Sequence, residues 1–208
     1  MLVIGVAGPA GSGKSTVCRM LAHRSGVAYI NCDELAWATY RHGGPSYAPL
    51  VARFGEEILT EDGAVDRDRL GRVALGDPQA KADLEAIVHP AVMEELHRAA
   101  AEHSKRGTEV VLVEGALLLA SPYVDRTLFD AFVWLYAPEE ERHKRLLSSG
   151  LEGSTVRRRL EAQGDLAPPV DPSVYPVDAS GRPVQAADRM WDLIQTLKQS
   201  GSQGAEHL

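Results

Sequence analysis

The residues best suited to chemistry form the segment Gly8–Ser15, which reads GPAGSGKS. It matches GxxxxGK[ST], the P-loop pattern, in which glycines let consecutive backbone N–H groups turn toward phosphate oxygens. The lysine of this pattern reaches the outer phosphates, and the hydroxyl after it binds Mg²⁺. The segment therefore predicts a polyphosphate and Mg²⁺ site made of Gly8, Gly11, Ser12, Gly13, Lys14, Ser15 and Thr16.

A glycine-rich turn without a ligand and a dinucleotide-binding loop are both disfavoured at this segment. An apolar strand pattern, LVIGVA, precedes it and a helical pattern follows it, which a turn without a ligand does not require. The dinucleotide fingerprint GxGxxG is incomplete, because Thr16 stands where the third glycine belongs after Gly11 and Gly13. We therefore expect a helix that directs its positive N-terminus at an anion.

Two acidic residues follow other apolar runs, at the sheet edge where open parallel sheets bind their ligands. Asp33 follows Val27–Asn31 and could take a proton from an attacking hydroxyl, or could instead cap the helix that begins there. Glu114 ends EVVLVE and could hold Mg²⁺ through water, or be a strand-end acid without a ligand. The residues alone leave both pairs of alternatives open.

Histidine, arginine and tryptophan supply the remaining candidates. His89 lies in a helical pattern, where a lone histidine is more often packed than catalytic. The run Arg157–Arg159 fits a solvated helix face or a phosphate contact from a closing lid. Trp37 shares a helical face with Asp33 and could line an acceptor pocket, whereas Trp134 lies in an apolar run and is expected in the core.

Short apolar runs alternate with helical patterns along the chain. Strands are predicted at Leu2–Ala7, Val27–Asn31, Glu109–Val113 and Ala131–Tyr136, with a short edge strand at Val174–Val177 because of Pro176. Helices are predicted at Lys14–His23, Glu34–Tyr40, Tyr47–Phe54, Arg67–Leu75, Gln79–Lys105, Glu139–Ser148, Thr155–Gln163 and Val184–Gln199. Because such alternation requires crossover connections, it predicts an α/β fold with a doubly wound parallel sheet.

Composition limits the class of protein further. The 208 residues can bury a core without disulfides, so Cys18 and Cys32 are expected to be free thiols. No apolar run reaches the ~18 residues needed to cross a bilayer, and no basic-flanked leader opens the chain, so we expect a cytoplasmic protein without a membrane partner. The 22 basic and 29 acidic residues give a charge of -7, which argues against nucleic-acid binding.

Several motifs in order make the chain resemble the dephospho-CoA kinase family. They are GSGKSTV at Gly11–Val17, NCDELA at Asn31–Ala36, GGPSYAPLVARFGEEILTEDGAVDR at Gly43–Arg67, LEAIVHPAV at Leu84–Val92 and AQ at Ala162–Gln163. The resemblance implies a P-loop NTPase with the nucleoside-monophosphate-kinase fold, a three-layer α/β/α sandwich. It implies one domain over residues 1–200, with a helical substrate-binding region at about 34–105 and a lid at about 142–170, before a frayed tail at 201–208.

The resemblance also implies an activity and a set of site residues. ATP and Mg²⁺ would bind at the P-loop, with Ser15 and Glu114 at the metal, and the phosphoryl group would pass to the 3′-hydroxyl of dephospho-CoA. Lys14 and Asp33 would be catalytic, Asp33 as the base, while Arg67 and His89 would lie near the acceptor.

The chain departs from this family mainly in the lid. Ala116–Ala120 reads ALLLA and lacks the family's proline and glutamate, and Glu141–Lys144 replaces QxxR. Ser148 or Ser149 stands where a lid arginine is expected, and no arginine follows Gln163 closely. The basic residues that could substitute are Lys144, Arg145, Arg157 and Arg158. Two alternatives follow: a kinase for another acceptor, such as a nucleoside or nucleoside monophosphate, or a nucleotide-binding protein with weakened catalysis.

Overall fold

The computed structural model describes residues 1–161, 168 and 170–204, without the side chains of Leu75 and of residues 201–204. Its strands are β1 Leu2–Ala7, β2 Val27–Asn31, β3 Val110–Glu114, β4 Ala131–Tyr136 and β5 Val174–Asp178. Its helices are α1 Lys14–Ala22, α2 Cys32–Thr39, α3 Tyr47–Phe54, α4 Arg67–Leu75, α5 Pro78–Lys105, α6 Glu139–Ser148, α7 Gly153–Glu161 and α8 Pro183–Gly204, with 3₁₀ turns η1 Glu56–Ile58 and η2 Arg126–Leu128. Strands and helices alternate, which confirms the predicted α/β class.

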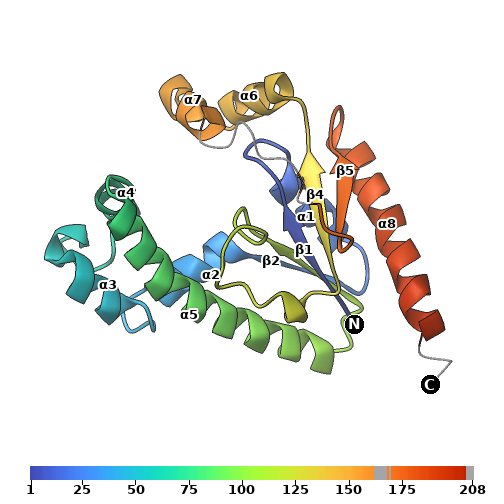
Figure 1. Cartoon of the computed structure of the whole chain (residues 1–208), viewed down its shortest axis with the longest axis horizontal. Helices are drawn as coiled ribbons and strands as arrows, with labels where there is room; N and C mark the ends of the chain where they lie inside the picture. Colours follow the sequence, from blue (N-terminus) through green and yellow to red (C-terminus); the bar gives the residue numbers. More distant parts are fainter. Residues whose placement is uncertain (162–167, 169, 205–208) are drawn as a thin grey trace. The chain divides into compact units, whose positions relative to one another are not determined.

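The strands form one sheet in the order β2-β3-β1-β4-β5 (Figure 1). β1 pairs in parallel with β3 and β4, and β4 pairs in parallel with β5. β5 lies at the edge of the sheet with Pro176 opposite Trp134, as predicted, since an edge strand tolerates a residue without an N–H donor.

The strand order reverses at β1, because the chain places β3 on one side of β1 and β4 on the other. Ligands of open α/β sheets bind at the carboxyl ends of strands that flank such a point. The register sets Val6 opposite Glu114, so the end of β3 lies beside the start of the P-loop that follows β1. The sheet itself therefore brings together two predicted site elements that are about a hundred residues apart in sequence.

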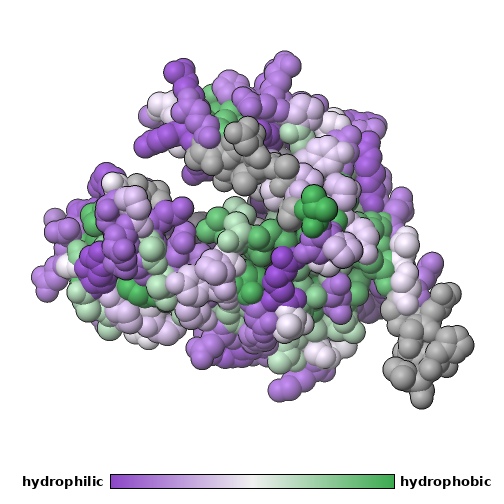
Figure 2. Space-filling view, viewed as in Figure 1, coloured by the Kyte–Doolittle hydropathy of each residue, from purple (hydrophilic) through white to green (hydrophobic). Residues whose placement is uncertain are grey.

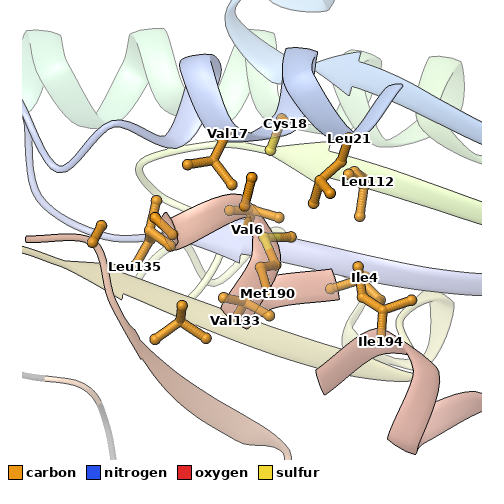
Figure 3. Close-up of a cluster of buried hydrophobic side chains, with 14 of the residues drawn as sticks. Ile4, Val6, Val17, Cys18, Leu21, Leu112, Val133, Leu135, Met190 and Ile194 are labelled. Carbon is orange, nitrogen blue, oxygen red and sulfur yellow. The ribbon is translucent and has the colours of Figure 1, made fainter. Parts of the chain in front are cut away.

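A hydrophobic core holds α1 and α8 against the sheet. Val17, Cys18 and Leu21 of α1 pack with Met190 and Ile194 of α8 and with side chains of the central strands (Figure 3). β-branched and leucine side chains fill the strand positions, as expected for strands buried on both faces. Because α1 begins directly after the P-loop, this packing anchors the loop to the sheet.

The chain divides into two compact units. The first comprises Met1–Ile30, His103–Ala120 and Arg126–Leu208, and the second comprises Asn31–Glu102 with Ser121–Asp125. The second unit has its own core, in which Leu50, Phe54 and Ile58 pack with residues of α4 and α5. Most of the region predicted to bind the acceptor, residues 34–105, belongs to this second unit.

Most predicted element boundaries hold to within two residues. β3 is shifted by one residue and ends at Glu114, and α8 extends past the predicted end at Gln199 to Gly204. α7 ends at Glu161, and the family-like Ala162 and Gln163 lie outside the described residues. Trp134 is 4% exposed, which confirms its predicted place in the core, and Cys18 and Cys32 form no disulfide, as expected.

Candidate active site

The P-loop connects β1 to α1 through a glycine-dependent backbone. Gly13 precedes α1 in the left-handed region, with φ 98°, and Gly11 has φ 77°. A Cβ added at Gly11 would lie 2.6 Å from the carbonyl oxygen of Arg142 in α6. No other residue type fits both constraints at position 11, so the loop keeps its tight contact with α6 only with glycine there.

Lys14 and Ser12 lie inside this loop. Lys14 Nζ donates hydrogen bonds to the carbonyl oxygens of Gly8 at 2.9 Å and Pro9 at 3.1 Å, which holds the ammonium group within the loop. Ser12 is fully buried, and its Oγ has no hydrogen-bond partner among the described residues. A buried hydroxyl without a partner is costly, which suits a loop built to receive an anion.

A pocket of about 320 Å³ opens beside the loop within the first unit. It is lined by Gly11–Val17, Glu114, Arg145 and residues after β5 that include Ala179 and Pro183. Backbone N–H groups at the start of α1 and the positive end of its dipole favour an anionic ligand at such a place. The predicted phosphate-binding residues, apart from Gly8, therefore line this pocket.

Glu114 is a buried carboxylate at the pocket. It is 7% exposed, and its Oε1 accepts a hydrogen bond from Ser15 Oγ at 2.7 Å. Its Oε2 accepts a hydrogen bond from the hydroxyl of Tyr29 in β2. The two residues predicted to share a metal ion are therefore in direct contact, and Tyr29 is a member of the group that the sequence did not single out.

Arg145 is a basic side chain of α6 that contacts the P-loop. Its Nη1 donates to the carbonyl oxygen of Ser12 at 3.2 Å, and its Nη2 donates to the carbonyl oxygen of Ala179 at 2.8 Å and to Glu141 at 2.9 Å. Lys144, the other candidate from α6, is exposed and pairs with Glu140. Of the basic residues named as possible substitutes, Arg145 is the one in the pocket lining, one position after the segment that replaces QxxR.

Arg142 adds a second positive charge behind the loop. The residue is 5% exposed, and its Nη1 donates to the carbonyl oxygen of Ala10 at 3.4 Å. Its Nε has no hydrogen-bond partner among the described residues. α6 therefore presents two arginines to the P-loop backbone, although the lid arginine expected near Ser149 is absent.

Asp33 lies in the first turn of α2, in the second unit, and is exposed. The possibility that Asp33 caps this helix is wrong, because Asn31 is the N-cap. Asn31 Oδ1 accepts hydrogen bonds from the backbone N–H groups of Asp33 at 2.8 Å and Glu34 at 3.3 Å. Since Asn31 provides the cap, helix capping does not account for the carboxylate at position 33.

Arg67 belongs to the same unit as Asp33. Its guanidinium carbon lies 3.7 Å from the ring centroid of Trp37, which is 40% exposed. Burial raises the pKa of Tyr40 to about 12, with Arg67 lowering this pKa and Asp33 raising it. Arg67 and Asp33 therefore both act electrostatically on the same phenol, and the guanidinium group lies over the ring of Trp37.

His89 is half-buried on α5. Its Nδ1 lies 2.9 Å from Ser121 Oγ, and its ring meets Tyr123 edge-on at 5.7 Å. Burial lowers the pKa of His89, and the charge of Glu85 opposes this shift. The imidazole is thus a packed group whose surroundings favour its neutral form, which agrees with the more frequent structural role of such a histidine.

The run Arg157–Arg159 is exposed on α7, whose buried residues are Val156 and Leu160. Figure 2 shows a mostly hydrophilic surface over α6 and α7. This arrangement favours a solvated helix face over a phosphate contact.

None of the described helices is long and apolar enough to cross a membrane.

The parallel sheet, the P-loop after β1 and the acidic residue at the end of β3 define a P-loop kinase. Shikimate kinase from Acinetobacter baumannii shares this fold with a TM-score of 0.53 at 18% identity, over 94% of this chain and 95% of that one. TT1252 from Thermus thermophilus matches with a TM-score of 0.72 at 26% identity, over 94% of this chain and 96% of that one.

Related sequences show to which family of P-loop kinases the chain is similar. The family model for dephospho-CoA kinase matches residues 2–170. The dephospho-CoA kinase of Syntrophotalea carbinolica is 34% identical over 198 residues, which is 95% of this chain and 92% of that protein. The dephospho-CoA kinase of Corynebacterium glutamicum is 39% identical over 164 residues, 78% of this chain and 83% of that protein.

The chain therefore belongs to the dephospho-CoA kinase family. Its activity is that of an ATP-dependent kinase that phosphorylates dephospho-CoA to CoA. The predicted family, fold class and reaction are confirmed, and of the three functions predicted from the sequence the first is the one supported.

Proposed function

We propose that this chain transfers the γ-phosphoryl group of ATP at its P-loop to the 3′-hydroxyl of dephospho-CoA, with Lys14 and Asp33 as catalytic residues. The contact between Ser15 Oγ and Glu114 Oε1 at 2.7 Å carries the proposal for the nucleotide site. It joins the hydroxyl that follows the P-loop lysine to a buried carboxylate beside the pocket. Such a pair of hard oxygen groups beside a polyphosphate site is the setting that Mg²⁺–ATP requires.

The residues present fit a Mg²⁺ ion held largely by phosphate oxygens. Among the described residues, no three His, Cys, Asp or Glu side chains gather into a metal site. Mg²⁺ commonly binds through one or two protein oxygens, water and substrate phosphates rather than in an all-protein cage. Ser15 would bind it directly and Glu114 through water, and the ion would neutralise charge on the transferring group.

Lys14 holds the outer phosphates in this proposal. Its Nζ already donates to the carbonyl oxygens of Gly8 and Pro9, so the ammonium group is kept inside the loop. The β and γ phosphates would replace these carbonyl oxygens as acceptors. Because the ammonium group needs only a short shift, its positive charge is preorganised for the reaction.

Arg145 replaces the missing lid arginines in this proposal. Its side chain is 27% exposed and lines the pocket next to the P-loop. Its contacts with Ser12, Ala179 and Gly181 hold the guanidinium in place. A positioned guanidinium stabilises the charge spread over phosphate oxygens in the transition state.

The acceptor is handled by side chains of the second unit. Asp33 accepts the proton of the attacking hydroxyl, while Asn31 caps α2 in its place. Arg67, stacked on Trp37, binds an anionic group of dephospho-CoA. His89 supports this region through Ser121 rather than acting in proton transfer.

A cytoplasmic location and the absence of a nucleic-acid partner stay predictions.

Coupled ADP release with the full chain, ATP, Mg²⁺ and dephospho-CoA tests the nucleotide site. Lys14→Ala should lower kcat/KM by roughly 10³-fold, because one preorganised charge is lost at the transferring group. Lys81→Ala, at an exposed lysine of α5 paired with Glu85, is the control and should match the wild type. Wild-type turnover by the Lys14 variant would contradict the proposal.

Asp33→Asn tests the base. The amide keeps the shape of the side chain but cannot accept the proton, so kcat should fall by roughly 10²-fold or more while ATP binding stays within about twofold. Glu34→Gln makes the same chemical change one residue later, at another exposed position of α2. Full activity in the Asp33 variant would remove Asp33 from the base role.

A further inference from the structure

The Glu114 carboxylate is held by hydroxyl groups from two different elements. Ser15, in the first turn of α1, donates to Oε1, and Tyr29, in the neighbouring strand β2, donates to Oε2. Only 7% of Glu114 is exposed, and a buried carboxylate is stable only where its oxygens are hydrogen-bonded. The two hydroxyl groups together keep this acid in one orientation beside the pocket.

The two donors differ in how easily they can give up their hydrogen bond to Glu114. Ser15 lines the pocket, and its hydroxyl is the one that a Mg²⁺ ion would take in the proposed site. Tyr29 does not line the pocket, and its ring packs against the hydrophobic core of the first unit. If Ser15 bound the metal ion, Tyr29 would still hold Oε2, and Oε1 would be available to accept a hydrogen bond from water.

We infer that Tyr29 is a positioning residue for the metal site, whose hydroxyl fixes the Glu114 carboxylate so that Oε1 faces Ser15 and a Mg²⁺-bound water. The inference rests on the proposed Mg²⁺–ATP site but not on the identity of the acceptor. Its physical reason is general: partners that orient a ligand of a metal ion determine how well the ion binds. The strand order gives Tyr29 this place, since β2 is the neighbour of β3.

Tyr29→Phe removes only the hydroxyl and is the test. ATP binding to the full chain would be measured by calorimetry across a Mg²⁺ titration and again with chelator. The half-saturating Mg²⁺ concentration should rise roughly tenfold, while affinity for ATP in chelator stays within about twofold. Tyr175→Phe, in β5 and outside the pocket lining, makes the same change as a control and should leave both values unchanged.

A double-mutant cycle separates positioning from a merely structural role. If Tyr29 acts through Glu114, adding Tyr29→Phe to Glu114→Gln should move the Mg²⁺ midpoint by less than about twofold. Tyr29→Leu also removes the hydroxyl, and leucine suits an apolar strand. We expect the same shift of the Mg²⁺ midpoint as in Tyr29→Phe, and this variant replaces Tyr29→Phe if that one fails to fold.

Three results would overturn the inference. They are an unchanged Mg²⁺ midpoint in Tyr29→Phe, an equal shift in the Glu114→Gln background, and an equal loss of ATP affinity in chelator. ATP binding by the wild type that does not respond to Mg²⁺ would instead overturn the proposed metal site together with the inference. Loss of turnover on dephospho-CoA alone would contradict the proposed acceptor chemistry and leave the role of Tyr29 standing.

Discussion

The guanidinium group of Arg145 joins the P-loop to the segment after β5. Nη1 donates to the carbonyl oxygen of Ser12 at 3.2 Å, while Nη2 donates to the carbonyl oxygens of Ala179 at 2.8 Å and Gly181 at 3.0 Å. One side chain of α6 therefore connects the P-loop with the segment after β5, and both segments contribute residues to the lining of the pocket.

Arg145→Ala should lower kcat/KM by roughly 10²- to 10³-fold, because both the charge and the link between the two segments are lost. Arg145→Lys should recover only part of this loss, since an ammonium group cannot bridge several acceptors as a planar guanidinium does. Steady-state kinetics at saturating Mg²⁺ measures both. Arg98→Ala, at an exposed arginine of α5, is the control. If Arg145→Ala has the same kcat/KM as Arg98→Ala, Arg145 has no role in phosphoryl transfer.

Gly11→Ala should weaken ATP binding by roughly tenfold or more and lower the thermal midpoint, because a left-handed residue with a Cβ costs about 1–2 kcal/mol. The added atom would also lie 2.6 Å from the Arg142 carbonyl oxygen, so α6 would have to move. Gly71→Ala is a matched control in α4, where a Cβ meets nothing within 4 Å. That variant should be stabilised by about 0.5–1 kcal/mol, as measured by thermal unfolding.

Trp37→Ala should raise KM for dephospho-CoA roughly fivefold with little change in kcat, since a cation–π contact of about 1 kcal/mol orients Arg67. Trp191→Ala removes a similar contact, with Arg24 at 4.6 Å, from the first unit and serves as the control. Equal KM values for the two variants would show that the Trp37–Arg67 stack plays no part in acceptor binding.

The pH dependence of the stability should report the protonation of His89. Its pKa is lowered by burial, so the unfolded chain binds a proton there at a higher pH than the folded chain does. The stability that neutral His89 contributes is complete above about pH 6.5 and is lost as the pH falls through its lowered pKa. His89→Asn should therefore lose less thermal stability than the wild type between neutral and mildly acidic pH.

His143→Asn, at an exposed histidine of α6, is the control for this measurement. A His89→Asn variant whose unfolding temperature falls with pH as steeply as that of the wild type would contradict the assignment.

Local patterns in the sequence predicted most of the secondary structure and the nucleotide motif. GPAGSGKS between an apolar strand and a helix places Lys14 and Ser15 because P-loop geometry depends on residues adjacent in the chain. The same holds for β1, β4 and Pro176 in the edge strand, where period and residue type act over a few positions.

The side chains that meet one another are known only from the structure. The hydrogen bonds of Asn31 exclude Asp33 as the helix cap, whereas the role of Asp33 as the base stays a proposal. It left Arg145 and Lys144 as equal substitutes, and only the packing of α6 on the P-loop separates them.

The position of Tyr29 shows the limit of local sequence patterns. The pattern VAYIN determined a strand, because alternation and apolar content act locally. That this strand lies beside β3, with the Tyr29 hydroxyl on Glu114, depends on the order of strands in the sheet. Strand order follows from the packing of the whole chain, so no local pattern of residues contains it.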